Sequence, residues 1–325
     1  MLRIATFNLE SLDDTPKTGV DFAERIAALR PILEALEADV LCLQEVNARR
    51  EQPKAERTFG ALDRVLAGTR YAGFHRAHTT RRDGKPLDRH NLVTLSRFPI
   101  RAARSVHHEQ VRRMTYRGPG PAGVPVEWDR PILVTEHAMG ERVVHVLNLH
   151  LRAPLASVIP GGKRSASQWA SSAAWAEGFF VSAVKRSGQA LEARLIADAI
   201  FDREPEALLV VAGDLNADSF EMPMRLLQAP AEEAGNPALA GRALTAIEQR
   251  IPAAQRFTAI HAGRRMLVDH VLVSAPLAAA CRDVRIFNAG LGDDMESGHY
   301  AAAPAGSFHG AIVAEFALDA PAGTA

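Results

Sequence analysis

The sequence predicts an α/β fold, and two observations carry that prediction. Several short runs rich in Val, Ile and Leu are nearly continuously apolar, as strands buried on both faces are. Helical patterns of apolar residues lie between some of these runs. The predicted strands cover residues 2–9, 39–46, 91–96, 143–151, 208–212, 266–274 and 310–316.

Two helices are expected from caps and apolar spacing. Asp21 and Glu24 have the spacing of an N-terminal capping box, and apolar residues then recur in steps of four and three as far as Leu36. Pro31 lies inside that stripe, so a kink or a restart is expected there. A second helix is expected after Ser187. Its predicted buried face consists of Leu191, Leu195, Ala199 and Ile200.

The composition describes a chain that can bury a large core. It has 325 residues, of which 47% are hydrophobic, enough for two small domains or one large α/β domain. No change of composition marks a linker, so we expect one domain over residues 1–318 and a flexible tail at 319–325. The 38 basic and 38 acidic side chains balance, and this neutral total does not predict general nucleic-acid binding.

Cysteine content and the absence of targeting patterns bear on location. Cys42 and Cys281 are interpreted as buried, reduced thiols, which fits a reducing compartment. The N-terminal residues run directly into a strand pattern, and no apolar stretch reaches membrane-spanning length. We therefore expect a soluble cytoplasmic protein without a transmembrane segment, and we predict no protein partner.

Polar side chains stand at the ends of the predicted strands. Residues two apart in a strand share one face, so two pairs of these residues should each point the same way. Taken singly, such residues are more often turn or cap residues, but here separate strand ends all carry them. The residues are Asn8, Glu45, Asn148, His150, Asp214, Asn216, Asp269 and His309.

Scattered oxygen ligands of this kind suit one chemistry. Phosphoester hydrolysis needs a cation to neutralise oxygens, a base to activate water and a group to hold the phosphate. Mg²⁺ binds through a few carboxylates and keeps several waters, so dispersed Asp, Glu and Asn fit it better than a dense Cys/His cluster would. The pattern indicates a Mg²⁺-dependent phosphoester hydrolase, with Mn²⁺ as the alternative ion.

Taken together, the motifs resemble the endonuclease/exonuclease/phosphatase superfamily, the DNase I-like metal-dependent phosphoesterases. The matching segments are residues 6–8, 43–45, 91–100, 148–150, 213–216 and 269–270. They follow the order of the family over nearly the whole chain. The resemblance implies a four-layer sandwich of two packed mixed β-sheets flanked by helices.

The resemblance also implies a role for each motif residue. Glu45 would be the principal Mg²⁺ ligand, with Asn8 as a second metal-site residue close by. Asp214 would orient or deprotonate the attacking water, and Asn216 would help bind the phosphate and position Asp214.

Histidines would complete the catalytic set. His309, oriented by Asp269, would stabilise the pentacovalent phosphate or transfer a proton. His150 would contact a phosphate oxygen or protonate the leaving group. The further residues expected to contact substrate are Asn91, Asn148, Arg97 and Lys163.

The last motif departs from the family. Where the family normally reads Ser-Asp-His, this chain reads Ser307-Phe308-His309. A phenyl ring can neither bind Mg²⁺ nor accept a proton, so metal binding or activity could be weakened, altered or lost. Nearby acids that could supply a carboxylate instead are Asp293, Asp294 and Glu296.

The substrate is expected to carry phosphate, and nucleic acid is one candidate. Residues 70–117 hold 12 Lys/Arg against three acids, which describes either a basic wall for a phosphate-rich substrate or a solvated loop face. Trp169, Trp175, Phe179 and Phe180 have the spacing of a helix packed on the core, so they are interpreted as structural rather than as a lipid-binding wedge. The expected activity is phosphodiesterase or nuclease action by direct attack of water. The alternatives are a small-molecule or lipid-headgroup phosphatase of the same fold and a non-catalytic binding module with a degenerate site.

Overall fold

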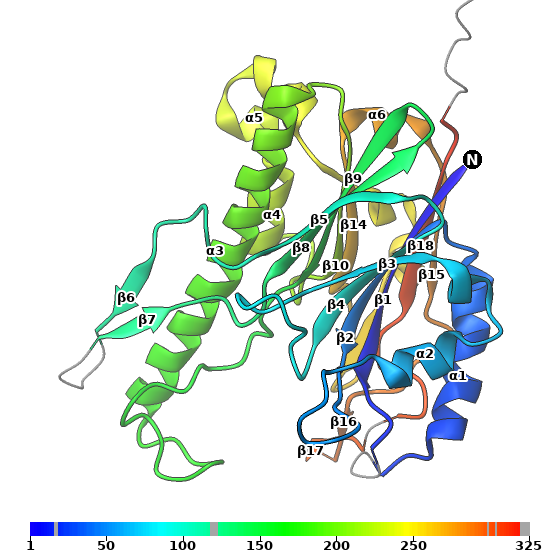
Figure 1. The fold of residues 1–325 in the computed structure, drawn as a ribbon. Helices are drawn as coiled ribbons and strands as arrows, with labels where there is room; N and C mark the ends of the chain where they lie inside the picture. The colour runs from blue at the N-terminus through cyan, green and yellow to red at the C-terminus, as the bar shows by residue number, and fades with distance from the viewer. Residues whose placement is uncertain (16–18, 118–122, 298, 303, 319–325) are drawn as a thin grey trace, which may run out of the picture.

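Two β-sheets pack face to face, with helices on both outer faces (Figure 1). This computed structural model describes residues 1–15, 19–117, 123–297, 299–302 and 304–318. It confirms the predicted four-layer α/β sandwich of two mixed sheets. The predicted tail at 319–325 lies outside the described residues.

The first sheet has the strand order β15-β18-β1-β2-β4-β3. Only β1 (Leu2–Leu12) and β2 (Val40–Val46) run parallel, so their carboxyl ends meet at one edge. Its other strands are β3 (His75–His78), β4 (Asn91–Ser96), β15 (Cys281–Phe287) and β18 (Ala311–Phe316).

The second sheet has the order β11-β14-β10-β9-β8-β5. Its parallel pair is β9 (Arg142–His150) and β10 (Leu208–Asp214), which again end together. The other strands are β5 (Ile100–Val106), β8 (Ile132–Met139), β11 (Thr245–Ala246) and β14 (Asp269–Val273).

The core forms three apolar layers. The layer between the sheets contains fully buried side chains from both, such as Ile4, Val146, Val210 and Ile312. Because strand side chains alternate between faces, the opposite faces are free to bind helices. The first sheet is covered by α1 (Phe22–Leu36) and α2 (Gly60–Leu66), and the second by α3 (Ser172–Arg203) and α4 (Met222–Gln228).

The helices differ from expectation in two respects. α1 starts where predicted, with the Asp21 side chain accepting a bond from the N–H of Ala23, but it continues through Pro31 as one element. The helices expected on either side of Ser187 are a single helix, α3, of 32 residues. Of the residues predicted for its buried face, Ile200 is buried, but Leu195 and Ala199 are exposed, so the predicted stripe was wrong at these two positions.

The remaining elements are short and connect the layers. None of the helices in the described residues is long and apolar enough to cross a membrane. These elements are η2 (Arg70–Gly73), β6 (Met114–Tyr116), β7 (Val124–Val126), α5 (Ala231–Ala234), η3 (Pro237–Arg242), η4 (Ile247–Arg250), η5 (Ala253–Gln255), β12 (Ala259–His261), β13 (Arg264–Met266), α6 (Ala275–Ala280), β16 (Met295–Glu296) and β17 (His299–Tyr300).

One part of the structure projects from the sandwich. The N-terminal half of α3, the preceding loop and the β6–β7 hairpin extend together past the carboxyl ends of β9 and β10 (Figure 1, lower left). We call residues 112–117, 123–128 and 151–187 the arm.

Candidate active site

The two parallel strand pairs bring most of the predicted residues to one edge of the sandwich. Asn8 from the first sheet donates through Nδ2 to Asp214 Oδ2 of the second sheet at 2.9 Å. Nε2 of His150 lies 3.3 Å from the same Asp214 oxygen and 3.7 Å from Glu45 Oε1. The edge therefore holds a buried cluster of carboxylate, amide and imidazole groups contributed by both sheets.

Glu45 has one anchored oxygen and one open oxygen. Its Oε2 accepts bonds from the N–H and hydroxyl of Ser11 at 2.8 and 2.9 Å. Its Oε1 has weaker contacts, with Asn8 Nδ2 at 3.5 Å and His150 Nε2 at 3.7 Å. Burial alone would raise the pKa of Glu45, but nearby His90 and Arg130 outweigh it and lower this pKa. An ionised carboxylate with a loosely held oxygen is suited to bind a divalent cation.

Asn8 lies between two carboxylates of the site. Its side-chain oxygen accepts the N–H of Glu10 at 2.9 Å, and its Nδ2 faces the carboxylates of Glu45 and Asp214. In this orientation the amide bridges the two carboxylates. Its place as a second metal-site residue stays a prediction.

Glu10 is a site residue that the sequence reasoning missed. The backbone of Phe308, the carboxylate of Glu45 and the ring of His309 all lie near enough to influence the pKa of its carboxyl. Burial raises its pKa, opposed by His309. The signal was an acid two residues after Asn8, at the end of the same strand. Glu10 and Glu45 together offer hard oxygen donors of the kind that Mg²⁺ prefers.

Of the three acids proposed to replace the missing motif carboxylate, Glu296 is exposed in β16 and the other two are engaged elsewhere. Asp293 accepts the N–H groups of Ala262, Gly263 and Met295. Asp294 pairs with His261 at 2.8 Å. The carboxylate near the backbone of Phe308 is instead that of Glu10, in β1.

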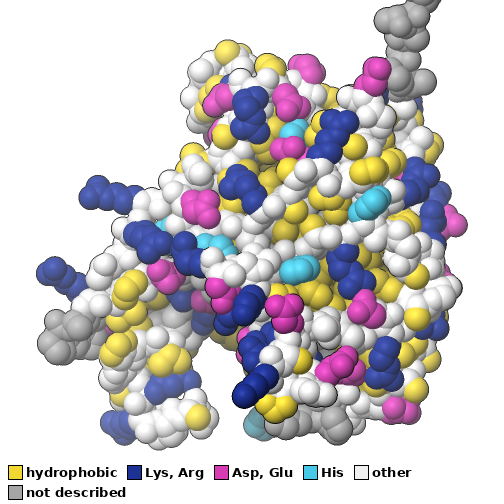
Figure 2. Space-filling model, viewed as in Figure 1, with side chains coloured by type: hydrophobic (Ala, Val, Ile, Leu, Met, Phe, Trp, Pro, Cys, Tyr) yellow, Lys and Arg dark blue, Asp and Glu magenta, His cyan; other side chains and the backbone are white. Residues whose placement is uncertain are grey.

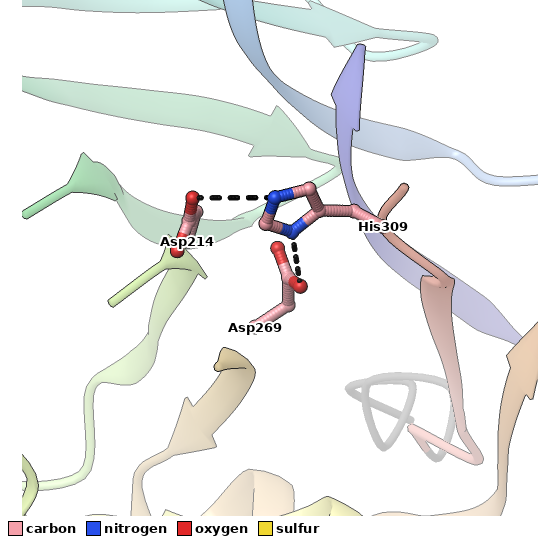
Figure 3. Close-up of side chains that lie close together, drawn as sticks. All are labelled: Asp214, Asp269 and His309. Atoms are coloured by element: carbon pink, nitrogen blue, oxygen red, sulfur yellow. Dashed lines mark hydrogen bonds and ion pairs between the residues drawn. The ribbon is translucent and has the colours of Figure 1, made fainter. Parts of the chain in front are cut away.

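Asp214, His309 and Asp269 form a chain of interactions (Figure 3). His309 Nδ1 donates to Asp269 Oδ2 at 2.8 Å, and its Nε2 lies 3.9 Å from Asp214 Oδ2. Burial alone would lower the pKa of His309, but the two carboxylates outweigh it and raise this pKa well above the usual value. Burial raises the pKa of Asp214 to about 7, partly offset by His309.

The same three residues could also be considered as metal ligands, because one ligand atom from each lies within 4.8 Å of the others. A protonated imidazole cannot ligate a cation, and Nδ1 of His309 already donates to Asp269. Mg²⁺ also favours oxygen over nitrogen ligands. The group is therefore arranged as a relay of charged and hydrogen-bonded side chains.

A hydrogen-bond chain that the sequence reasoning missed supports Glu45. Arg130 Nη2 lies 3.4 Å from His90 Nδ1, and His90 Nε2 lies 3.1 Å from the Ser11 hydroxyl, which donates to Glu45. Burial lowers the pKa of His90, so a neutral ring can accept from Arg130 and donate to Ser11. Arg130 also binds the carbonyl of His150 at 3.2 Å. No sequence motif marks these residues, because they meet only when the sheets pack.

Asn216 and His150 hold positions close to Asp214. The N–H of Asn216 donates to Asp214 Oδ1 at 2.9 Å, and its side-chain amide donates to the carbonyl of Leu151 at 3.1 Å. Burial lowers the pKa of His150 well below the usual value, with Arg130 adding to the effect. Asn216 therefore orients Asp214, while His150 is held as a neutral ring.

Four residues predicted to contact substrate lie apart from this cluster. Asn148 is fully buried between the sheets, where its amide binds Gln44 and the carbonyls of Leu43 and Val93. Asn91 is also fully buried, and it holds the turn at Leu87. For both amides, substrate contact was the wrong expectation, because their hydrogen-bonding groups are already used. The remaining two residues are Arg97, which pairs with Asp39 at the far end of β4, and Lys163, which lies in the arm.

Several strand ends at the site adopt left-handed backbone conformations that are uncommon outside glycine. The residues concerned are Glu10 (φ 51°), Ser11 (50°), Glu45 (61°), His90 (54°) and Asn216 (47°). Such conformations persist where surrounding contacts fix them, and they concentrate at functional sites.

A two-sheet sandwich with this cluster at its strand ends defines the DNase I-like class of phosphoesterase and nuclease folds. The chain belongs to the Endonuclease/Exonuclease/phosphatase family, whose model matches residues 5–293. A comparison with curated proteins finds no match.

Solved structures share the fold at low sequence identity. Truncated TDP2 from Caenorhabditis elegans has a TM-score of 0.56 and 16% identity, over 97% of this chain and 96% of that one. The 3′ phosphatase NExo from Neisseria, bound to a product DNA hairpin, has a TM-score of 0.54 and 16% identity over 98% and 100%. An AP endonuclease from Archaeoglobus fulgidus has a TM-score of 0.51 and 17% identity over 98% and 100%.

Proposed function

We propose that this protein hydrolyses a phosphodiester by direct attack of water, with Mg²⁺ as cofactor and Mn²⁺ as the alternative ion. One observation carries the proposal. The open carboxylate oxygen of Glu45 and the relay of Asp214, His309 and Asp269 occupy one buried cluster, joined by His150 and Asn8.

The donor set fits the ion. Glu45 Oε1 and the Glu10 carboxylate are the residues that would hold Mg²⁺, and the repulsion between them, which contributes to the raised pKa of Glu10, would be relieved by a cation. When bound, the ion supplies charge stabilisation for the phosphate oxygens. Ser11, His90 and Arg130 keep the Glu45 carboxylate in place for this purpose.

Asp214 is proposed to orient the attacking water and accept its proton. A pKa raised to about 7 makes the carboxylate a stronger base than an exposed aspartate, which suits general base catalysis near neutral pH. The N–H of Asn216 fixes Oδ1, and Asn8 fixes Oδ2. Both bonds limit rotation of the base.

His309 is proposed to stabilise the negative charge that develops on the phosphoryl oxygens. His309 Nδ1 donates its hydrogen bond to Asp269. Its Nε2–H therefore points to the side of Asp214, where the reacting phosphate would lie. Neutral His150 would contact a phosphate oxygen. No covalent intermediate is needed, since the water is the nucleophile.

Nucleic acid is the substrate class we favour among phosphodiesters. The NExo structure holds a product DNA hairpin, and it resembles this chain in fold. The basic segment at 70–117 supports this choice only in part. Some of its cations are already paired with acids, as Arg76 is with Asp63 and Arg104 with Glu109.

The test is a substrate panel with the full chain. Hydrolysis of bis-p-nitrophenyl phosphate, plasmid DNA and p-nitrophenyl phosphate is measured with Mg²⁺, with Mn²⁺ and with EDTA, beside His309→Ala. We expect metal-dependent turnover of the two diesters that EDTA and the substitution abolish. Equal background from both proteins with every metal would refute the enzyme proposal, and a preference for the monoester would shift it to a phosphatase.

A further inference from the structure

The arm exposes an unusual amount of apolar surface. The expectation that its aromatic residues pack on the core was wrong, because Trp175, Phe179 and Phe180 are 47%, 41% and 58% exposed. Leu155 and Val158, in the loop before α3, are 52% and 69% exposed. Soluble proteins rarely leave such side chains grouped in contact with water unless they bind a partner or a membrane.

These side chains belong to one surface. The N–H of Ser157 donates to the carbonyl of Gly178 at 2.8 Å, which holds the loop between Leu155 and Val158 against the turn of α3 that carries Phe179 and Phe180. The Tyr116 hydroxyl donates to Glu177 at 2.9 Å and attaches the hairpin to the same turn. Figure 2 shows hydrophobic and basic side chains together on the arm, which a hollow separates from the body.

The arm is also strongly basic within a neutral protein. It contains eight Lys/Arg against two acids, Glu127 and Glu177, while the whole chain has a net charge of zero. Several of these cations have carboxylate partners, as in the pair of Arg113 with Glu127. Within the described part of the arm, the cations without an ion-pair partner are Arg112, Arg117, Lys163 and Arg164.

We propose that the arm docks on an anionic phospholipid surface. Its apolar side chains would enter the interface, and its unpaired cations would bind lipid phosphates. Aliphatic side chains such as Leu155 and Val158 gain from an acyl boundary but offer no ring for a nucleic-acid base. The rings of Trp175 and Phe179 stack on each other at 5.4 Å, so one face of each is already covered.

Docking would present the reaction centre to that surface. The arm starts directly after His150, and Arg186 of α3 binds the carbonyl of Asn216 at 2.5 Å and Glu221 at 2.8 Å. The base of the arm is therefore fixed to residues that hold Asp214. This inference does not depend on which phosphodiester the site hydrolyses.

The experiment is vesicle sedimentation of the full chain in EDTA. Vesicles of phosphatidylcholine alone are compared with vesicles of three parts phosphatidylcholine and one part phosphatidylglycerol. We expect binding to the anionic vesicles, a fall of about tenfold in the partition coefficient for Val158→Gln/Phe180→Gln, and a fall of at least about fivefold for Arg164→Glu. The matched controls are Phe220→Gln, at a side chain that is 92% exposed outside the arm, and Arg282→Glu, and both should bind like the parent.

Other results would overturn the proposal. No sedimentation of the parent chain, or equal losses in arm and control variants, would exclude lipid docking by the arm. Arm variants that lose duplex DNA binding but keep vesicle binding would assign the surface to nucleic acid, and conversion of a dimer to a monomer would assign it to self-association. Unchanged hydrolysis of bis-p-nitrophenyl phosphate by the arm variants would show that they fold and would separate this test from that of the proposed activity.

Discussion

Phe308 leaves the last motif without a carboxylate, so a neighbouring residue must supply the negative charge. Its ring lies against Gly292, where an added Cβ would come within 3.3 Å of the ring, and its backbone lies near Glu10 and lowers the pKa of that carboxyl. Position 308 therefore supports the site through its backbone. The negative charge that the family places here would instead come from Glu10, which lies in β1.

If Glu10 supplies this charge, Glu10→Gln should weaken the binding of Mg²⁺. The substitution keeps size but removes a charge, so the Mg²⁺ concentration for half-maximal activity should rise roughly tenfold or more. Phe308→Asp added to that variant should recover part of the loss. Metal titrations of hydrolysis measure both effects, with Glu296→Gln as the control. An unchanged Mg²⁺ dependence in Glu10→Gln would remove Glu10 from the proposed metal position.

Asp214 gives the second prediction at this scale. Asp214→Asn keeps the size of the side chain and one of the two acceptor oxygens that Asn8 and Asn216 bind, but it cannot accept a proton, so kcat should fall by roughly 10²–10⁴. Asp218→Asn, at an exposed acid nearby, should leave kcat unchanged. Steady-state kinetics with bis-p-nitrophenyl phosphate measure the difference. A loss in Asp214→Asn no greater than that of the control would contradict a role as base.

At the scale of elements, α3 couples the body to the arm by close packing. Its buried face is lined by Ala190, Ala193 and Ala197, whose small size allows the helix axis to approach the sheet. At Gly188 the helix has a notch filled by Trp128, so that an added Cβ would lie 2.3 Å from the indole. His108 stacks on the other side of that indole at 3.9 Å.

The notch predicts that Gly188→Ala destabilises the fold although alanine is the better helix former. The methyl group must displace a packed indole, which costs about 1–3 kcal/mol of unfolding free energy. Gly241→Ala, where nothing lies within 4 Å of the added Cβ, is the matched control. Urea unfolding gives both values. Equal stabilities of the two variants would mean that Trp128 moves aside without cost.

At the scale of the whole molecule, most of the buried strands were predictable, but the buried β8 and the more exposed β5 and β15 were not. Runs such as 208–212 are apolar on both faces because helices and a second sheet cover them. β5 escaped prediction because most of its side chains are exposed, and β15 because charged residues interrupt its apolar run. The stripe assigned to α3 failed at Leu195 and Ala199, which are exposed, whereas the predicted Ile200 is buried. Alanines take much of the face that packs on the sheet.

The candidate site divides in the same way. Glu45, Asp214 and His309 could be found because motif residues at strand ends are local in sequence. His90 and Arg130 could not, because their contacts with Glu45 depend on loops from both sheets meeting. The amides of Asn91 and Asn148 are similar to site residues in sequence, yet the fold uses them internally.

Global stability should depend on pH through one buried pair. His270 is fully buried, with Nδ1 2.7 Å from Glu248 and Nε2 2.8 Å from the carbonyl of Ala217. Burial alone would lower its pKa, but Glu248 outweighs it and raises this pKa above 6.5. A raised folded-state pKa gives stabilisation that is complete below the unfolded value and lost as pH rises through the folded value.

The stability difference between the parent chain and Glu248→Gln should therefore shrink as pH rises above 6.5 and through the raised folded-state pKa of His270. Urea unfolding of both proteins across that range measures it, and ¹⁵N chemical shifts of the His270 ring report its protonation directly. A difference that stays constant or grows would show that the ring is neutral in the folded protein.

The position of β18 has a consequence for how the protein is made. β18 lies between β15 and β1, and residue 316 pairs with residue 2. The first strand to be synthesised therefore cannot pair on this side until the last strand has been made. His309 stands two residues before β18. If His309 acts as proposed, a nascent chain that already contains Glu45 and Asp214 would stay inactive until the last strand has been synthesised and has paired with the first.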